Sequence, residues 1–360
     1  MTYEELQNLT PEEIEKLQKE NDNETTRDLL LAFLLLIKVI SENGRVRLYI
    51  RNGDPVPISG TANLGQLSKE LDTVITAFLN RINVIVTTGI EKSLILGDQK
   101  SMVDVIDKIT PDMFKQLSEK GLFAQRKSAL DEFLIRKTKG LKLSERVWKL
   151  KGPLKFEIEQ ILQLGVVDGR GAAQIARDLT RHLQEPDKLF RRIAEAKTGG
   201  LKLSKAAEAY NPGRGVYRSS YKNALRLARN EINKAYRLAQ YDRIQSLPFV
   251  TGIKISLSGS HPDRMPKGDI CDELQGIYPK TVKWSGWHVM CMCRVTSVLA
   301  SDKEIGDYLA TYDTSHPNLP PQIKTLPESI KSWASENKDR YQSGRVDWID
   351  DNKDILSMLK

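Results

Sequence analysis

Apolar residues recur at spacings of three and four through the first two thirds of the chain, which predicts mainly helices. The longest such pattern covers 64–86. The run "LLLAFLLLIKVI", Leu29–Ile40, is apolar on nearly every side of the helix that it predicts, 27–43. Such a helix needs to be covered by the 64–86 helix or by a partner. We expect residues 1–25 to form a short helix and a polar linker, with a capping box at Thr10–Glu13.

The pattern changes after Pro248. Two helices are predicted within 153–186 and a long one from Ser219 to Ser246, but residues 253–257 alternate between apolar and polar, which indicates a strand. Residues 293–300 predict a returning strand. Residues 45–60 predict a hairpin or an extended loop, because the alternation there meets Asn52-Gly53 and two prolines. The proline-rich segment from Ser301 onward is interpreted as an arm outside the core.

These elements predict an α+β fold. It has a mainly helical N-terminal region, a smaller mixed lobe with short antiparallel strands, and an extended C-terminal arm. Four consecutive segments are expected: an arm with the apolar helix (1–60), a helical region (61–139), a mixed domain (140–300) and the C-terminal arm (301–360).

Charge and composition narrow the class of protein only slightly. The chain has 55 Lys and Arg against 47 Asp and Glu, a net charge of +8, which is compatible with an anionic partner but equally with a solvated surface of mixed charge. The N-terminus lacks the features of a secretory signal. Leu29–Ile40 is too short to cross a membrane, which takes about 20 apolar residues. Three cysteines favour a reducing compartment and argue against a disulfide scaffold.

The cysteines are concentrated in one stretch of the sequence. Cys271, Cys291 and Cys293 lie within 23 residues, with His288 among them in "GWHVMCMCRV". Thiolates and imidazole are ligands that a four-coordinate zinc ion prefers, so these four residues form a candidate structural zinc site. The alternatives are buried cysteines without metal, or a disulfide. His261 is a spare candidate ligand.

One geometric condition limits the zinc hypothesis. On a regular strand, Cys291 and Cys293 would be about 6.5–7 Å apart at Cα. Two thiolates on one zinc ion lie about 3.8 Å apart, since each Zn–S bond is about 2.3 Å long. A zinc site therefore requires the backbone to leave strand geometry at Met292.

No constellation typical of catalysis is present in the sequence. There is no phosphate loop, no Ser/His/Asp order and no HExxH motif. The loop "NPGRGVYRSS" offers Arg214 and Arg218 as candidate phosphate contacts, although an ordinary loop is the simpler interpretation. The basic helix that follows is explained equally well by local ion pairs on a solvated surface.

Several stretches together resemble the phage head morphogenesis family, the Mu F-like minor head proteins. "RSSYKNALRLARNEINKAYRLAQ" is similar to the Arg-x-x-Arg-Thr-Glu helix of that family. "GDICDELQGIYPK" and "GWHVMCMCRV" are similar to its Cys-bearing segment and its closing His-Pro-x-Cys-Arg-Cys, and the resemblance covers about 140–300. By this resemblance Arg226, Arg229 and Glu231 are the helix signature, with a structural role of fixing the helix against the Cys-bearing lobe.

This sequence departs from the family pattern at four positions. Asn230 replaces Thr, Leu274 stands where a second Cys is expected, Val289 replaces Pro, and Met292 replaces Arg. The loss of one Cys leaves Cys271, His288, Cys291 and Cys293 as the ligand set.

The resemblance implies a virion protein without enzymatic activity. We expect it near the portal vertex, acting in head assembly with the portal protein and other head proteins, and passing through the host cytoplasm during assembly. Contact with packaged DNA is a further expectation; a membrane or a small-molecule substrate is not expected. The alternatives are a zinc-stapled nucleic-acid-binding protein, or a Mu F-like domain with toxin or nuclease activity.

Overall fold

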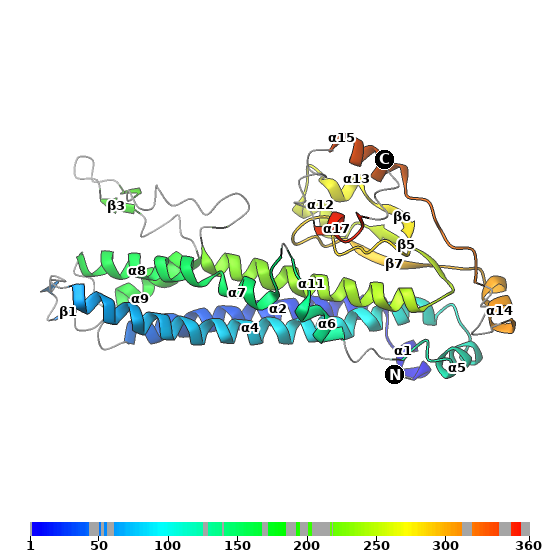
Figure 1. The fold of residues 1–360 in the computed structure, drawn as a ribbon, viewed down its shortest axis with the longest axis horizontal. Coiled ribbons are helices and arrows are strands. Elements are labelled where there is room, and N and C mark those ends of the chain that lie inside the picture. Colours follow the sequence, from blue (N-terminus) through cyan, green and yellow to red (C-terminus); the bar gives the residue numbers. More distant parts are fainter. Residues whose placement is uncertain are drawn as a thin grey trace. The chain divides into compact units, whose positions relative to one another are not determined.

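The chain folds into two compact units in a computed structural model (Figure 1). Unit 1 consists of Met1–Asp22, Gly89–Ile135 and Asn230–Lys360, and unit 2 of Asn23–Thr88 and Arg136–Arg229. Both units combine distant segments, so their boundaries differ from those of the four predicted segments, and 140–300 contributes to both. The structure describes residues 2–42, 50–51, 54–55, 61–124, 129–138, 140–167, 172–184, 192–194, 201–203, 217, 219–311, 319–337 and 347–353.

Helices dominate the described part of unit 2, as the spacing of apolar residues predicts. It contains the later part of α2 (Pro11–Glu42) and the first part of α4 (Thr61–Ile106). It also contains α7 (Leu143–Trp148), α8 (Lys151–Val167) and α9 (Ala172–Gln184). The helix predicted at 64–86 is therefore part of a longer one, and both helices predicted within 153–186 are confirmed.

The polar linker predicted within residues 1–25 is instead part of helix α2. No polar linker separates a short first helix from the Leu-rich helix: α1 (Tyr3–Gln7) is followed by α2, which runs without a break from Pro11. The predicted capping box is confirmed, because the Thr10 amide donates to Glu13 Oε2 at 2.7 Å and the Glu13 amide donates to Thr10 Oγ1 at 3.1 Å. The polar positions remain helical because some are buried and bonded. Asn21, for example, donates to the Gly89 carbonyl oxygen at 2.8 Å.

The apolar segment of α2 is covered on one side. Phe33 lies edge-to-face against Phe78 of α4, with ring centroids 4.6 Å apart, which confirms that the 64–86 helix covers it. The opposite side of α2 keeps exposed apolar side chains, namely those of Leu31, Leu34, Leu35 and Val39.

Two short hairpins complete the described elements of unit 2. Strands β1 (Ile50–Arg51) and β2 (Asp54–Pro55) pair antiparallel, which agrees with the hairpin alternative at these four residues; the rest of 45–60 lies outside the described residues. Strands β3 (Arg192–Ala194) and β4 (Leu201–Leu203) form a second antiparallel pair, which the sequence analysis did not predict.

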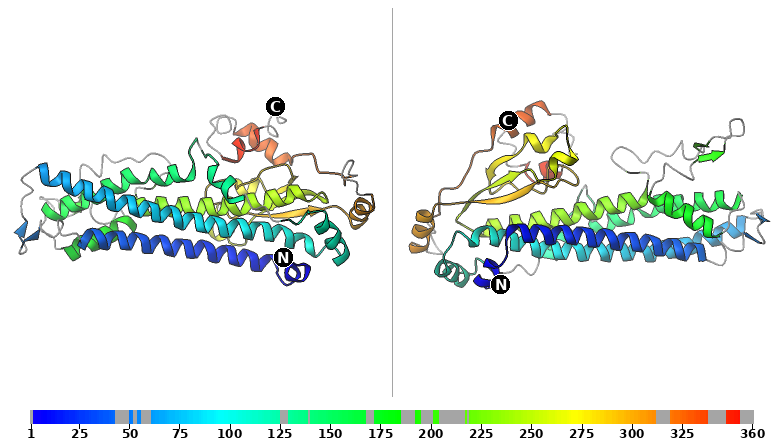
Figure 2. Two further views of the ribbon diagram at one scale, coloured as in Figure 1. Left: turned by 60° about the horizontal axis from the view of Figure 1, so that its bottom comes forward. Right: turned by 180° about the vertical axis from the view of Figure 1, so that it is seen from behind.

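Unit 1 contains a three-stranded antiparallel sheet in the order β6-β5-β7 (Figure 2). Helix α11 (Ser220–Ser246) leads into β5 (Val250–Ser256), and β6 (Gly276–Pro279) and β7 (Arg294–Leu299) pair on either side of β5. The strand after Pro248 and the returning strand are confirmed. The short β6 was missed, because four residues are too few to show an alternation. Unit 1 also includes α5 (Pro111–Glu119) and α6 (Ala129–Ile135).

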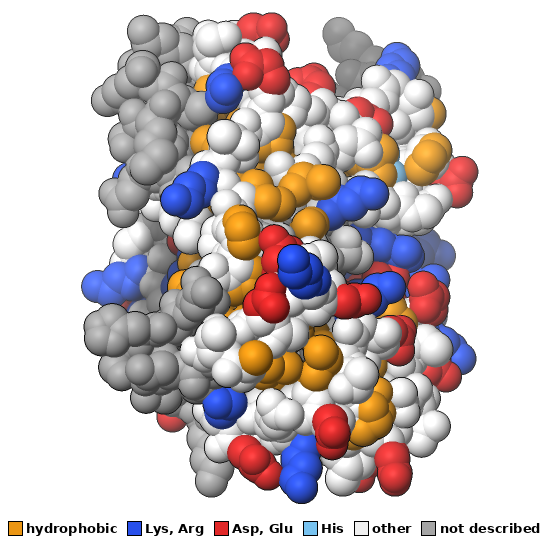
Figure 3. All heavy atoms as spheres, turned by 90° about the vertical axis from the view of Figure 1, so that its right-hand side faces the viewer, with side chains coloured by type: hydrophobic (Ala, Val, Ile, Leu, Met, Phe, Trp, Pro, Cys, Tyr) orange, Lys and Arg blue, Asp and Glu red, His pale blue; other side chains and the backbone are white. Residues whose placement is uncertain are grey.

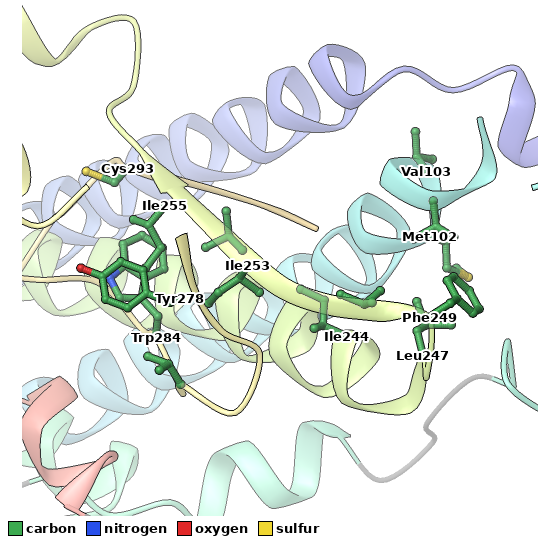
Figure 4. Packing of buried hydrophobic residues seen from close by; sticks show 14 of the residues in the cluster. Met102, Val103, Ile244, Leu247, Phe249, Ile253, Ile255, Tyr278, Trp284 and Cys293 are labelled. Carbon is green, nitrogen blue, oxygen red and sulfur yellow. The ribbon is translucent and has the colours of Figure 1, made fainter. Parts of the chain in front are cut away.

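The central strand β5 contributes Val250, Ile253 and Ile255 to the core of unit 1 (Figure 4). Ile253 is opposite Tyr278 of β6, and Ile255 is opposite Val295 of β7. A Cβ atom at Gly252 would lie 2.8 Å from the Tyr278 carbonyl oxygen, so the strand approaches its neighbour closely only because this residue is glycine.

The segment after Ser301 contributes to this core, which corrects its interpretation as an arm. It forms α14 (Asp302–Ala310), α15 (Glu328–Glu336) and α17 (Asp347–Asp350). Trp348 lies edge-to-face against Trp287 at 4.9 Å between centroids, and Trp333 lies 5.5 Å from Trp348. All three indoles are buried, because the large apolar rings cover one another. The prolines therefore mark a crossing between helices rather than the end of the fold.

The fold class is confirmed as mainly helical α+β with a small antiparallel sheet. Within α4, the stretch Ser68–Ile106 is long and apolar enough to cross a membrane by length and composition. A core helix meets the same criterion, and α4 buries side chains such as Leu79 and Val103, so one such helix is weak evidence for a membrane.

Candidate metal centre

Cys271 lies on a short helix whose start is fixed by two carboxylates. Helix α13 (Ile270–Glu273) has Asp269 as its N-cap, and Asp269 Oδ1 accepts from the Cys271 amide at 2.7 Å. Asp272 Oδ2 accepts in return from the Asp269 amide at 2.7 Å, which completes a capping box. These bonds hold the buried Cys271 in a defined orientation.

A tight turn brings His288 and Cys291 together. The Cys291 amide donates to the His288 carbonyl oxygen at 3.2 Å, and Met290 has a φ of 62°, which is uncommon for a residue other than glycine. Residues 291–293 precede β7 rather than belonging to it. Met292 is 41% exposed, whereas Cys291 and Cys293 on either side are buried.

The donor atoms converge as a metal ion requires. Cys271 Sγ is 3.1 Å from His288 Nε2 and 3.7 Å from Cys291 Sγ. The second distance is close to the separation of about 3.8 Å expected for two thiolates on one zinc ion. Cys293 is buried two residues after Cys291 and is the remaining thiol of this segment. The cluster of Cys271, His288, Cys291 and Cys293 can therefore hold a metal ion. All three cysteines are free, so the disulfide alternative is not realised in this structure.

The ring of His288 is oriented for coordination through Nε2. Its Nδ1 lies 2.9 Å from the Val289 carbonyl oxygen. A carbonyl only accepts, so Nδ1 carries the proton, and in a neutral ring Nε2 keeps its lone pair facing Cys271. In a doubly protonated ring, Nε2 would instead donate to Asp269 Oδ2, which is 3.2 Å away.

Arg237 of α11 holds the ligand loop by its backbone. The buried guanidinium donates to the carbonyl oxygens of Ser285, at 3.0 Å, and of Cys291. It also lies over the Trp284 ring, 4.5 Å from the centroid. Gly286 makes room for it, because a Cβ there would be 2.4 Å from Arg237 Nη1. These contacts fix the guanidinium and the two carbonyl groups in the vicinity of the thiols.

The three thiols share their protons unequally. The hydrogen bond with Cys271 holds the pKa of Cys291 well below the ordinary thiol value, with further lowering by Cys293 and by the charge of Arg237. The same hydrogen bond to Cys291, with Cys293 and burial, raises the pKa of Cys271. Contact with Cys271 lowers the pKa of Cys293, but Cys291 and burial outweigh it and raise that pKa to about 12. Cys291, whose pKa is lowered and which lies beside Arg237, is therefore the thiol that the surroundings favour as a thiolate.

A cavity of about 300 Å³ adjoins the centre within unit 1. Arg237 and Cys293 contribute to its lining, together with residues from the start of α2 and from the loop after β5. An ion pair between Arg294 and Glu15, 2.8 Å long, also borders it. Cys293 is therefore at the border between the metal centre and this cavity.

The structure brings the four predicted ligands together, but the other predicted residues lie elsewhere or outside the described part. Arg226 is 5.9 Å from the Tyr217 ring in unit 2, and the buried Glu231 accepts from Asn230 at 3.1 Å. The structural role predicted for Arg226, Arg229 and Glu231 stays a prediction. Arg214 and Arg218 lie outside the described residues.

Sequence reasoning missed two parts of the centre. Asp269 and Asp272 flank Cys271 in "GDICDE", and their closeness to it was a usable signal. Arg237 gave none, because the buried residues of α11 include several charged ones, so periodicity does not single out one arginine.

Comparison of the chain with known protein families, with curated proteins and with solved structures finds no match.

Proposed function

We propose that this protein is a phage minor head protein that acts in head morphogenesis near the portal vertex, with a structural zinc ion in its Cys/His cluster. The observation that carries the proposal is the pair of hydrogen bonds from Arg237 to the carbonyl oxygens of Ser285 and Cys291, in the loop 285–293. The two stretches that resemble the Mu F-like family, the basic helix and the His/Cys segment, are far apart in the sequence. Direct hydrogen bonds between them support their being parts of one domain.

Zinc suits the donor set better than other common metals. Three thiolates and one imidazole are soft or intermediate ligands, and zinc accepts a four-coordinate site of this composition. Four protein ligands leave no open position for a substrate. We therefore propose a structural role for the ion, fastening α13 to the loop that precedes β7, and no enzymatic activity for the chain.

Contact with packaged DNA is a weaker part of the proposal. The net charge of +8 favours an anionic partner. On the face of the molecule in Figure 3, however, acidic and basic side chains lie beside one another rather than separating by sign. A DNA contact would therefore use another surface. The mixed charges on this face also do not support the alternative of a nucleic-acid-binding protein.

The test is to follow the protein into phage heads. A host that produces the phage encoding this chain would express a tagged copy, and purified heads would be cross-linked and analysed by mass spectrometry. We expect a few copies per head, cross-linked to the portal protein. Absence from purified heads at normal intracellular levels would overturn the proposal. Growth arrest of the host on expression of the chain alone would favour the toxin alternative.

A further inference from the structure

Cys271 belongs to two groups of metal-binding side chains rather than one. In the first group, the ligand atoms of Cys271, His288 and Cys291 all lie within 4.8 Å of one another. In the second, the same limit holds for Cys271, His261 and Asp269. His288 and His261 thus belong to different groups, but both lie near Cys271 Sγ. A thiolate sulfur has enough lone pairs to bind two cations at once.

Asp269 faces both histidines with different oxygen atoms. Its Oδ2 is 3.2 Å from His288 Nε2, and its Oδ1 is 3.7 Å from His261 Nε2. The carboxylate is 14% exposed, so water does not account for its orientation. A carboxylate placed in this way between two imidazoles can bind an ion beside the first one, since the ions of two-metal sites lie about 3.5–4 Å apart.

The second group also has a fourth donor. Asp272 Oδ2 is 2.9 Å from His261 Nε2. Together, His261, Asp269, Cys271 and Asp272 supply one nitrogen, two oxygens and one sulfur, a complete set for a four-coordinate ion. His261 sits on the short helix α12 (His261–Arg264), in the loop between β5 and α13.

From this arrangement we propose that the centre holds two divalent metal ions that share the Cys271 thiolate. The first ion is bound by Cys271, Cys291, Cys293 and His288, and the second by His261, Asp269, Asp272 and Cys271. This inference rests on the metal site of the proposed function. It adds the second ion and assigns His261 and both aspartates as ligands.

The charges of the centre favour two ions over one. With three thiolates and two carboxylates, the ligands carry five negative charges. One divalent ion and the buried guanidinium of Arg237 offset three of them and leave two, of which only the charge of the 41% exposed Asp272 is partly solvated. A second divalent ion offsets the remainder. Uncompensated charge is costly where the groups are shielded from water, as at Cys271, Cys291 and Asp269.

The experiment counts metal ions in the full-length protein. Protein stripped by a chelator would be reloaded with zinc, desalted and analysed for metal and protein content. We expect two zinc ions per chain in the wild type and one in His261→Ala. Asp272→Asn is the second variant, since its side chain is 41% exposed and the change keeps its size. Asp263→Asn, an exposed position in the same short helix, is the control that should keep two ions.

Cadmium loading gives an independent readout. With ¹¹³Cd in place of zinc, the wild type should show two resonances, one from the thiolate-rich site and one from the mixed site. Asp272→Asn should shift or remove only the second. Circular dichroism of each variant would verify that it is folded.

Each outcome decides the inference. One ion in the wild type, unchanged in both variants, would overturn the second site and leave the first; His261 and Asp272 would then be only a hydrogen-bonded pair. Two ions in every variant would overturn the assigned ligands, and no metal in the wild type would overturn both sites. The role in head assembly is tested separately by the analysis of purified heads, so its failure is distinguishable from each of these.

Discussion

The guanidinium of Arg237 donates a hydrogen bond to the carbonyl oxygen of Cys291, and so joins helix α11 to the ligand loop through the backbone of a ligand. The same side chain donates to Ser285, and it lies over the ring of Trp284. The loop 285–293 has little regular secondary structure of its own. Its conformation therefore depends on Arg237 as well as on any bound metal.

Replacement of Arg237 should destabilise unit 1. Arg237→Met leaves buried carbonyl oxygens without donors, so we expect the free energy of unfolding to fall by about 2–4 kcal/mol in urea titrations. Arg237→Lys should recover only part of this, because an ammonium group cannot match the planar fork. The control is Arg226→Met on the same helix, where loss of the contact with Tyr217 should cost about 1 kcal/mol or less. Equal effects at both positions would contradict the role of Arg237.

Metal removal should lower the melting temperature. An ion bound only by the folded chain adds about 4 kcal/mol when its free concentration is 1,000 times its Kd, so chelation should shift the transition by several degrees. Cys291→Ser should reproduce part of this loss, and a chelator should then lower the melting temperature of the variant by less than that of the wild type. Met292→Ser, at the exposed position between the two cysteines, is the matched control and should still respond to the chelator. A chelator without effect on the wild type would mean that the cysteines only pack.

The C-terminal helices should be essential for the stability of unit 1. Trp348 is buried against Trp287, so Trp348→Ala should lower the free energy of unfolding by about 3–5 kcal/mol. Trp148→Ala is the control, because that indole is 39% exposed and its loss should cost about 1 kcal/mol or less. Similar effects of the two substitutions would show that the segment after Ser301 is not part of the core.

The two sides of α2 should respond differently to substitution. Leu36 is 3% exposed and Leu35 is 47% exposed. Leu36→Ala should cost about 2–4 kcal/mol, measured by thermal unfolding, and Leu35→Ala less than about 1 kcal/mol. Leu34→Asp should leave stability nearly unchanged, since Leu34 is 38% exposed, but should reduce incorporation into heads if a partner covers this side. Normal incorporation would exclude that partner.

The capping box of α14 should produce a pH dependence. Hydrogen bonds from the Ser301 hydroxyl and amide hold the pKa of Glu304 below its ordinary value of 4.5. A carboxyl group with a lowered pKa in the folded state stabilises the protein above its ordinary pKa, and this contribution is lost as the pH falls through the lowered value. The difference in melting temperature between wild type and Glu304→Gln should therefore be constant above pH 4.5 and shrink below it. A difference independent of pH would contradict this.

Much of the fold was determined by the sequence alone, because helices and long strands leave local patterns. The apolar spacing predicted α8, α9, α11 and much of α4, and the change after Pro248 predicted β5 and β7. The four ligands were recognisable too, since three cysteines and a histidine within 23 residues are chemically distinctive.

The tertiary structure decided what depends on distant partners. The polar start of α2 is helical because Asn21 bonds to Gly89, 68 residues away. The segment after Ser301 belongs to the core because Trp348 meets Trp287, and β6 exists because β5 offers it hydrogen bonds. At the centre, the turn at Met290 provides the curvature that regular strand geometry lacks, and Arg237 reaches the ligand loop from a helix about 50 residues earlier. Such contacts leave no periodic trace in the sequence, because the residues that make them are adjacent only after the chain has folded.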